Sequence, residues 1–70
     1  MLTVDARGRS CPEPVILTKN ALAKGEKEIR VLADNQTAVD NITYFVTRAG
    51  ASVQVNPQGG EFELLIHQGK

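Results

Sequence analysis

Seventy residues make one small domain, and a chain of this length buries only about 60% of the surface that it exposes when unfolded, so a deep internal pocket is not expected. Eight Lys and Arg residues balance eight Asp and Glu residues, which excludes a strong overall field for nucleic acid or an anionic membrane but leaves local basic patches open. No apolar run approaches the roughly 20 residues that span a bilayer, and Met1 leads into a short predicted strand instead of a signal peptide.

The first half of the chain predicts a strand, a loop, a helix and a second strand. Residues 2–6 alternate apolar and polar side chains, which is typical of a strand with one buried face. After a loop over residues 7–10, apolar positions at helical spacing predict a helix from Pro12 that Gly25 ends. Residues 27–33 predict the second strand, with alternate apolar side chains facing one way.

The second half predicts a helix followed by a hairpin. Asp34 or Asn35 caps a second helix that runs to about Ala49 and carries its apolar side chains on one face. Two alternating strands follow, over residues 51–56 and 61–66. The Pro-Gln-Gly-Gly segment between them supplies the turn.

The predicted order is β-α-β-α-β-β, which belongs to the α+β class. Because the strands carry one apolar face and both helices are amphipathic, we expect a two-layer sandwich with both helices on one face of a four-stranded mixed sheet. The other face of the sheet would be wet. Residues 1–70 then form a single domain, which is either complete or the N-terminal domain of a longer chain.

The one cysteine, Cys11, lies where the first loop turns into the first helix. A helix N-terminus gathers unpaired backbone N–H groups and the positive end of the helix dipole, and both lower the pKa of a thiol. Pro12 and Pro14 suit the first helical turn because proline has no N–H to lose there. Since a residue before proline avoids the α region, Pro12 also holds Cys11 outside the helix. Cys11 is therefore the candidate for chemistry.

The surroundings of Cys11 decide between a reactive and an inert thiol. A free cysteine is commonly a buried, inert hydrophobe, but this one follows Ser10 at a loop–helix junction, which favours exposure. Arg7 and Arg9 add positive charge near the thiol, while Glu13 opposes them. We expect the net effect to be activation.

The single cysteine and the single histidine limit other chemistry. One cysteine cannot form an internal disulfide, so we expect a cytoplasmic protein. A zinc site within one chain needs more ligands than Cys11 and His67 supply, and we expect neither a metal nor another cofactor. A Cys–His dyad is the alternative use of His67, but strand alternation places this histidine on the wet face of the sheet, away from the helices.

Several polar residues flank the loop that leads to Cys11. Asp5 either orients this loop by accepting its N–H groups or initiates the turn, and the two roles are compatible. Gly8 supplies the positive φ that a turn needs. Asp34 and Asn35 follow the second strand, so they adjoin the Cys11 loop if the first two strands are parallel, and at least one of them caps the second helix.

Residues 4–15 read Val-Asp-Ala-Arg-Gly-Arg-Ser-Cys-Pro-Glu-Pro-Val. This segment resembles the Cys-Pro-x-Pro signature of the TusA-like, or SirA-like, sulfur-carrier family, including the Asp-x-x-Gly that precedes it. The similarity covers essentially the whole chain, because the length and the element order also agree with that family's small two-layer domain. Asp34-Asn35 followed by Asp40-Asn41-Ile42 is more similar to the selenium-metabolism branch called YedF, whose members often carry a second domain.

The resemblance implies a sulfur relay. Cys11 would accept a persulfide sulfur from a cysteine desulfurase or a rhodanese-like protein and pass it to an acceptor protein, in tRNA thiolation or in selenium or sulfur metabolism. Pro12 and Pro14 would fix the presentation of Cys11. The other residues that match the motif are Asp5, Gly8 and Glu13.

Two departures from the family pattern bear on the partners. Arg9 and the serine after it stand where many members have an apolar residue and then a basic one, and Gln36 stands where a proline often opens the second helix. A relay needs a thiolate that attacks a donor persulfide and is then attacked itself. Because another protein must bring its cysteine to Cys11, we expect donor and acceptor to dock around Arg7, Arg9 and Lys19.

Two other functions compete with the relay. The alternative is a non-catalytic regulatory or interaction module of a selenium- or sulfur-handling protein, in which the Cys11 loop only docks. Nucleic-acid binding ranks last, because Phe45 belongs to the predicted core and Tyr44 stands nearly alone, without a basic stripe. We therefore expect protein partners, with no nucleic acid and no membrane.

Overall fold

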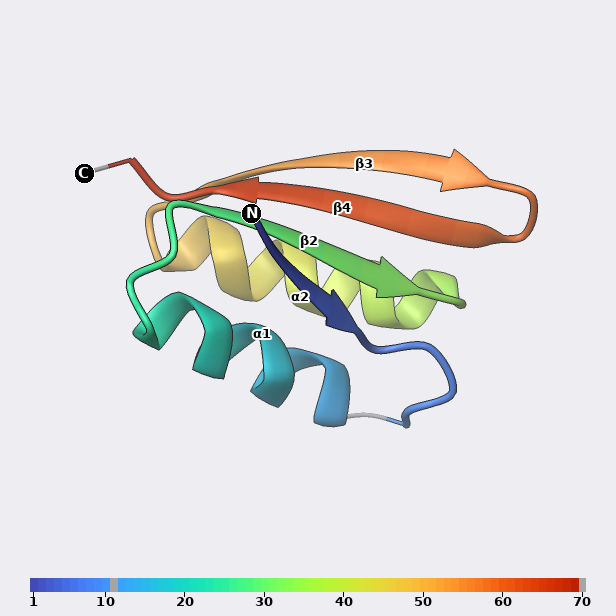
Figure 1. Ribbon diagram of the computed structural model, residues 1–70. Coiled ribbons are helices and arrows are strands. Elements are labelled where there is room, and N and C mark those ends of the chain that lie inside the picture. Colours follow the sequence, from blue (N-terminus) through green and yellow to red (C-terminus); the bar gives the residue numbers. More distant parts are fainter. Residues whose placement is uncertain (11, 70) are drawn as a thin grey trace.

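The computed structural model describes residues 1–10 and 12–69, so the predictions made for Cys11 lie outside the described residues. The described part of the chain forms its elements in the predicted order (Figure 1). These elements are β1 (Leu2–Asp5), α1 (Glu13–Ala23), β2 (Glu28–Ala33), α2 (Gln36–Arg48), β3 (Ser52–Gln58) and β4 (Glu61–His67).

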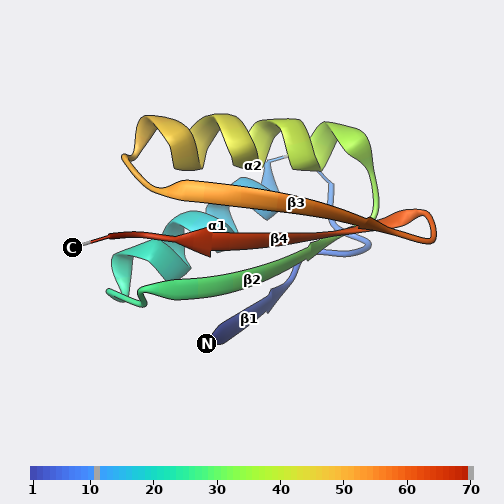
Figure 2. The same cartoon turned by 90° about the horizontal axis from the view of Figure 1, so that it is seen from above.

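The strands form one four-stranded mixed sheet with the spatial order β1-β2-β4-β3. β1 is parallel to β2, and β4 is antiparallel to both β2 and β3. Both helices cover the same face of this sheet, as Figures 1 and 2 show together. The predicted two-layer α+β sandwich is confirmed. Because β1 and β2 are parallel, their carboxyl ends meet at one edge, where the loop after β1 and the start of α2 both lie.

The core lies between the helices and the sheet face that they cover. Alternate residues of the central strands point into it, as the period of two in the sequence requires. The buried polar residue Thr18 also faces the core, and its hydroxyl donates to the Pro14 carbonyl at 2.9 Å, so it is not left unpaired. The buried apolar residues are Ala6, Ala21, Ile29, Val31, Ala33, Ala38, Val39, Ile42, Val46, Leu64 and Ile66.

Asn35 is the residue that caps α2. Its Oδ1 accepts the N–H of Ala38 at 2.7 Å, and its own backbone is extended, as an N-cap requires. α2 ends with Ala49 as the C-cap, followed by Gly50 in the left-handed conformation, with a φ of 88°. Of the two predicted cap residues, Asn35 makes the cap, and Asp34 is available for another contact.

α1 begins differently from the prediction. The helix starts at Glu13, Pro12 is its N-cap residue instead of its first residue, and no side chain caps it. Pro12 has a φ of −101° and a ψ of 18°, which is not the extended conformation that a capping side chain uses. At the other end, Gly25 follows the helix with a φ of 82°, as predicted.

The β3–β4 hairpin is tighter than the sequence suggests. β3 continues through Pro57 to Gln58, so the prediction that Pro57 belongs to the turn is wrong. Proline is tolerated here because β3 is an edge strand. Gly59 and Gly60 form the turn, and their positive φ values of 55° and 87° match a type I′ hairpin.

The uncovered face of the sheet is polar, as predicted. Arg30 of β2 donates a hydrogen bond to Glu63 of β4, and Asn56 of β3 donates to the same carboxylate at 3.4 Å. The hydrogen bond from Arg30 is the main reason that the pKa of Glu63 is lowered. His67 is exposed on this face, with Nδ1 3.9 Å from a carboxylate oxygen of Glu28. This position agrees with the prediction that His67 lies away from the helices.

Candidate functional site

The loop over residues 6–10, called the cysteine loop below, continues the β1–β2 pairing for one residue and then leaves the sheet. The N–H of Ala6 donates to the Leu32 carbonyl at 2.8 Å, and Ala6 is buried. Oδ1 of Asp5 accepts the N–H of Arg7 at 3.1 Å, so Asp5 contacts the loop in the way that the sequence suggested. Gly8 has a φ of 75°, which is the left-handed conformation expected of it.

Arg7 is held by two carboxylates. Its Nε and Nη2 atoms donate to Asp5 at 2.9 and 3.0 Å, and Nη1 donates to Glu61 at 3.2 Å. The hydrogen bonds from Arg7 lower the pKa of Asp5 to about 2. Since Asp5 and Glu61 offset the guanidinium charge, Arg7 adds less positive field to the cysteine loop than its sequence position suggests.

Asp34 joins the cysteine loop to the start of α2. Its Oδ2 accepts the N–H of Gly8 at 2.8 Å, and its Oδ1 accepts Nδ2 of Asn35 at 2.9 Å. These bonds, the one from Gly8 most of all, lower the pKa of Asp34. The parallel pairing of β1 and β2 thus brings Asp34 to the cysteine loop, as the sequence predicted.

The first turn of α1 uses its N–H groups within the main chain. Glu13 donates to the Ser10 carbonyl at 2.9 Å, Val15 donates to the Pro12 carbonyl at 3.1 Å, and Pro14 has no N–H. The expectation of unpaired N–H groups at this helix start is therefore wrong for Glu13 and Val15. The electrostatic part of the expectation is unaffected, because the aligned peptide units of the whole helix produce the dipole.

Two exposed cations lie before and along α1. Arg9 has Nη1 at 3.9 Å from Oε1 of Glu13, and about half of each side chain is exposed. Such a surface pair is weak, so Arg9 can turn to another carboxylate at little cost. Lys19 is exposed further along α1. Arg9 and Lys19 are therefore more accessible to a binding partner than Arg7.

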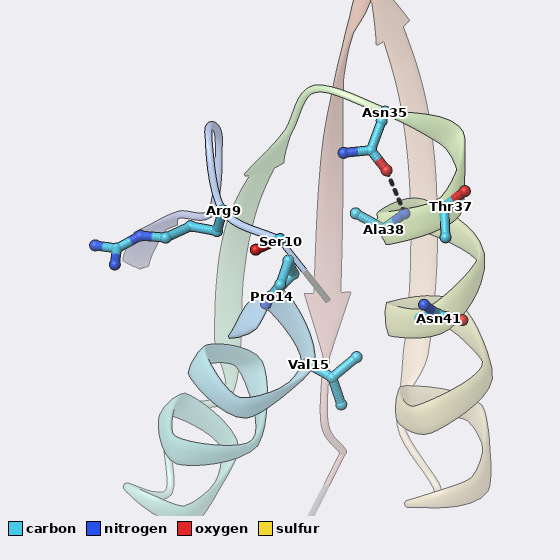
Figure 3. Close-up of a pocket in the computed structure, with 8 residues that line it drawn as sticks. All are labelled: Arg9, Ser10, Pro14, Val15, Asn35, Thr37, Ala38 and Asn41. Carbon is cyan, nitrogen blue, oxygen red and sulfur yellow. Dashed lines mark hydrogen bonds between the residues drawn. The ribbon is translucent and has the colours of Figure 1, made fainter. Parts of the chain in front are cut away.

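A surface pocket of about 280 Å³ separates the cysteine loop and α1 from the start of α2 (Figure 3). Figure 3 shows Val15 extending from α1 toward α2 across this pocket. The volume is just below the roughly 300–1,000 Å³ of typical small-molecule sites. Chain length limits the buried core only, so it could not predict a hollow between two helix starts. The lining residues are Arg9, Ser10, Pro14, Val15, Asn35, Thr37, Ala38 and Asn41.

The sequence reasoning missed an aromatic–cation pair on α2. The guanidinium carbon of Arg48 lies 5.4 Å from the ring centroid of Tyr44, whose exposed fraction is 65%. The spacing of four residues on a predicted helix was the signal that could have indicated this pair. Ile16 of α1 is also exposed, by 47%, so apolar surface is present on both helices.

The described carboxylates with clearly lowered pKa values are Asp5, Asp34 and Glu63, and each accepts hydrogen bonds. Across residues 1–10 and 12–69, no three His, Cys, Asp or Glu side chains are grouped so that they could hold a metal ion. In the same part of the chain, no helix has the length and apolar composition to cross a membrane.

A family model described as "Sulfurtransferase TusA" matches residues 2–68. The chain belongs to the TusA sulfurtransferase family. This TusA match runs from β1 to beyond β4 and includes the cysteine loop, so it confirms the family resemblance inferred from the Cys-Pro-x-Pro segment. Membership of the TusA family supports a sulfur-carrier role that involves other proteins.

The structural comparison agrees with the TusA assignment. This chain is similar to a SirA-like protein from Desulfitobacterium hafniense whose crystal structure is known. The two sequences are 35% identical, the match covers 100% of each chain, and the TM-score is 0.89. A comparison with curated proteins finds no match. The fold and the family are thus supported by two independent comparisons, one of sequence and one of structure.

Proposed function

We propose that this chain is a sulfur carrier in which Cys11 holds the transferred sulfur as a persulfide. The observation that carries the proposal is the TusA family match over residues 2–68, a range that includes the only cysteine of the chain. A persulfide forms on a cysteine thiolate, and no other residue of the sequence supplies a thiol. In this proposal Pro12, Glu13 and Pro14 fix how Cys11 is presented.

The relay consists of two exchange steps that need no external oxidant or reductant. In the first, the Cys11 thiolate attacks the terminal sulfur of a donor persulfide. An S–S bond forms on Cys11, the S–S bond of the donor breaks, and the donor leaves as a thiolate. In the second, an acceptor thiolate attacks the outer sulfur on Cys11, and Cys11 leaves as a thiolate. The carrier then returns to its starting state.

The electrostatics around the cysteine loop support the attacking thiolate. The positive end of the α1 dipole and the exposed Arg9 both favour a negative charge at the residue that precedes Pro12, while Glu13 acts against them. The hydrogen bonds that Asp5 and Asp34 accept hold the loop against the sheet and against α2. A held loop reduces the entropy that is lost when a partner must be met in one geometry.

The partners in this proposal are proteins that dock around the cysteine loop. Arg9 and Lys19 are the exposed cations that an acidic partner surface would meet. Arg7 belongs to the same proposed surface, with a smaller role because Asp5 and Glu61 already bind it. No direct contact with nucleic acid or a membrane is proposed.

The finer assignments rest on the sequence similarity. The donor is a cysteine desulfurase or a rhodanese-like protein, the acceptor is another sulfur-relay protein, and the compartment is the cytoplasm. The pathway is tRNA thiolation or selenium or sulfur metabolism, and the likeness of Asp34-Asn35 and Asp40-Asn41-Ile42 to the YedF branch favours selenium. The competing function is a non-catalytic regulatory module in which Cys11 takes up no sulfur.

Sulfur loading distinguishes these two functions. The wild type and Cys11→Ser are incubated with cysteine and a cysteine desulfurase whose activity is confirmed on a known acceptor, and the intact mass is then measured. We expect the wild type to gain a sulfur atom that a reductant removes, and Cys11→Ser to gain none. An unmodified wild type beside an active desulfurase would contradict the carrier assignment for that donor and favour the regulatory module.

A further inference from the structure

Asp34 is the side chain that connects the cysteine loop to α2. Its Oδ2 accepts the N–H of Gly8 at 2.8 Å, across a sequence separation of 26 residues. Its Oδ1 accepts Nδ2 of Asn35 at 2.9 Å, and Oδ1 of Asn35 accepts the N–H of Ala38 at 2.7 Å. A chain of three hydrogen bonds therefore runs from the cysteine loop into the first turn of α2.

These hydrogen bonds join the two sides of the surface pocket. Arg9, which directly follows Gly8, lines one side, and Asn35 and Ala38 line the other. Figure 3 shows the same arrangement, with the cysteine loop and α1 facing the start of α2 across the pocket. The contact between Asp34 and Gly8 thus sets how far the segment that leads to Cys11 lies from α2.

We propose that Asp34 is a positioning residue for sulfur exchange, because its carboxylate fixes the cysteine loop, which leads to Cys11, relative to the start of α2. This inference rests on the proposed sulfur-carrier function. Exchange between two proteins requires the attacking sulfur and the S–S bond to be aligned, and a displacement of about 1 Å can slow such a step about 100-fold.

Neither capping of α2 nor global stability accounts for the contacts of Asp34. The helix cap of α2 is already supplied by Asn35, so Asp34 is not needed for that purpose. Gly8 has a left-handed backbone conformation, with a φ of 75°, and in this conformation its N–H donates to the Asp34 carboxylate. Because Asp34 is exposed, its hydrogen bonds contribute little to global stability, and their local effect is to fix the loop.

Three variants test the proposal. Asp34→Ala removes both contacts, whereas Asp34→Asn keeps an amide oxygen that can accept the N–H of Gly8. Asp40→Ala is the matched control, since it removes the same charge from an exposed residue of α2 whose side chain bonds to Gln36. For each protein we compare the rate of sulfur transfer from a persulfide-loaded cysteine desulfurase, the rate of alkylation by iodoacetamide, and the melting temperature.

We expect Asp34→Ala to transfer sulfur about tenfold more slowly or worse, while its alkylation rate changes by less than about threefold. Asp34→Asn should stay within about threefold of the wild type in transfer, and Asp40→Ala should match the wild type. The amide of Gly8 should exchange its hydrogen faster in Asp34→Ala than in Asp34→Asn, and the melting temperatures should stay close together.

Four results would overturn the inference alone. They are an unchanged transfer rate in Asp34→Ala, an equal fall of transfer and alkylation, an Asp34→Asn variant as slow as Asp34→Ala, and an Asp40→Ala variant as slow as either. A wild-type protein that takes up no sulfur from an active desulfurase would instead contradict the proposed function, and the positioning role with it. The two failures are therefore distinguishable.

Discussion

The two helices of this domain begin in contrasting ways at the same edge of the sheet. α2 begins with a side-chain cap, in which Asn35 accepts the N–H of Ala38. α1 begins at Glu13, after Pro12 as an N-cap residue without a side-chain cap, and the main-chain carbonyls of Ser10 and Pro12 accept the N–H groups of Glu13 and Val15. The start of α2 thus depends on one side chain, whereas the start of α1 depends on the backbone.

The contrast between the two helix starts suits two different roles, stabilising the fold at α2 and favouring a thiolate at α1. A capping oxygen at the start of α1 would occupy the positive end of the helix dipole, which is the region that favours a thiolate at Cys11. Among the described residues, no side-chain oxygen accepts a hydrogen bond from the start of α1, although the Glu13 carboxylate lies in its first turn. We infer that α2 anchors the edge of the sheet and that α1 presents the reactive residue, and four predictions test this division.

The largest effect is expected from reversing charge at the start of α1. Arg7→Glu combined with Arg9→Glu should slow sulfur transfer from a desulfurase by about tenfold and weaken its salt dependence, because exposed charges steer protein association. Arg9→Glu alone should cause most of the loss, since Asp5 and Glu61 already bind Arg7. Initial transfer rates at low and high ionic strength measure both effects.

The control for Arg9→Glu alone is Lys27→Glu, the same single charge reversal at an exposed residue at the opposite end of β2. It should leave transfer unchanged. Alkylation by iodoacetamide is measured beside transfer, because added carboxylates also raise the pKa of a nearby thiol. If transfer and alkylation fall by the same factor, the arginines act on the thiol and the proposed docking role is wrong. If neither rate changes, both the docking role and the effect on the thiol are wrong.

The second effect concerns stability at the two helix starts. Asn35→Ala should lower the free energy of unfolding by about 1 kcal/mol and the melting temperature by roughly 4–8 °C, because it removes the cap of α2. Glu13→Ala, in the first turn of α1, should lower the free energy of unfolding by less than about 0.5 kcal/mol. The control Thr47→Ala, at an exposed residue in the last turn of α2, should have an equally small effect. Thermal and urea unfolding measure these differences, and an equal cost for Glu13→Ala and Asn35→Ala would refute the contrast.

The third effect concerns the thiol at the start of α1. We expect the Cys11 pKa to lie below the ordinary value of about 8.5, because the helix dipole and Arg9 favour the thiolate. Glu13→Gln should lower it further, since it removes a nearby negative charge. Thiolate absorbance followed against pH measures both. A thiolate that forms only above about 8.5 would show that this helix start does not activate the cysteine.

The smallest effect concerns pH and the anchoring of the cysteine loop. The pKa of Asp5 falls from 3.8 to about 2 because Arg7 donates hydrogen bonds to the carboxylate. A carboxyl group with a lowered pKa in the folded state stabilises the fold above its unfolded pKa and loses that contribution as the pH falls through its folded pKa. The contact between Asp5 and Arg7 should therefore be constant from neutral pH down to about 4 and be lost near pH 2. NMR titration of the Asp5 carboxyl carbon should give a midpoint near 2, and a midpoint near 3.8 would rule the contact out.

Local patterns in the sequence were sufficient for the elements and for the candidate nucleophile. Each strand and α2 bury one face, and the apolar residues of that face recur at a fixed spacing along the chain. A short stretch of sequence is therefore enough to predict these elements. The cysteine loop could be predicted for the same reason, because Gly8 and the prolines act within a few residues. The errors at Pro12 and Pro57 concern only where an element begins or ends. Proline fits the first turn of a helix and also the residue before it, as at Pro12. It fits a turn and also the end of an edge strand, as at Pro57.

The sequence by itself thus determined the two-layer fold and the family, and it indicated Cys11 as the candidate for chemistry. Only the tertiary structure decided that Asn35 caps α2 while Asp34 accepts the N–H of Gly8, that Arg7 reaches Glu61, and that a pocket lies between the helix starts. The contacts of Asp34 with Gly8 and of Arg7 with Glu61 join residues that are 26 and 54 positions apart. They exist because β2 lies between β1 and β4 in the sheet, and no local pattern encodes that strand order.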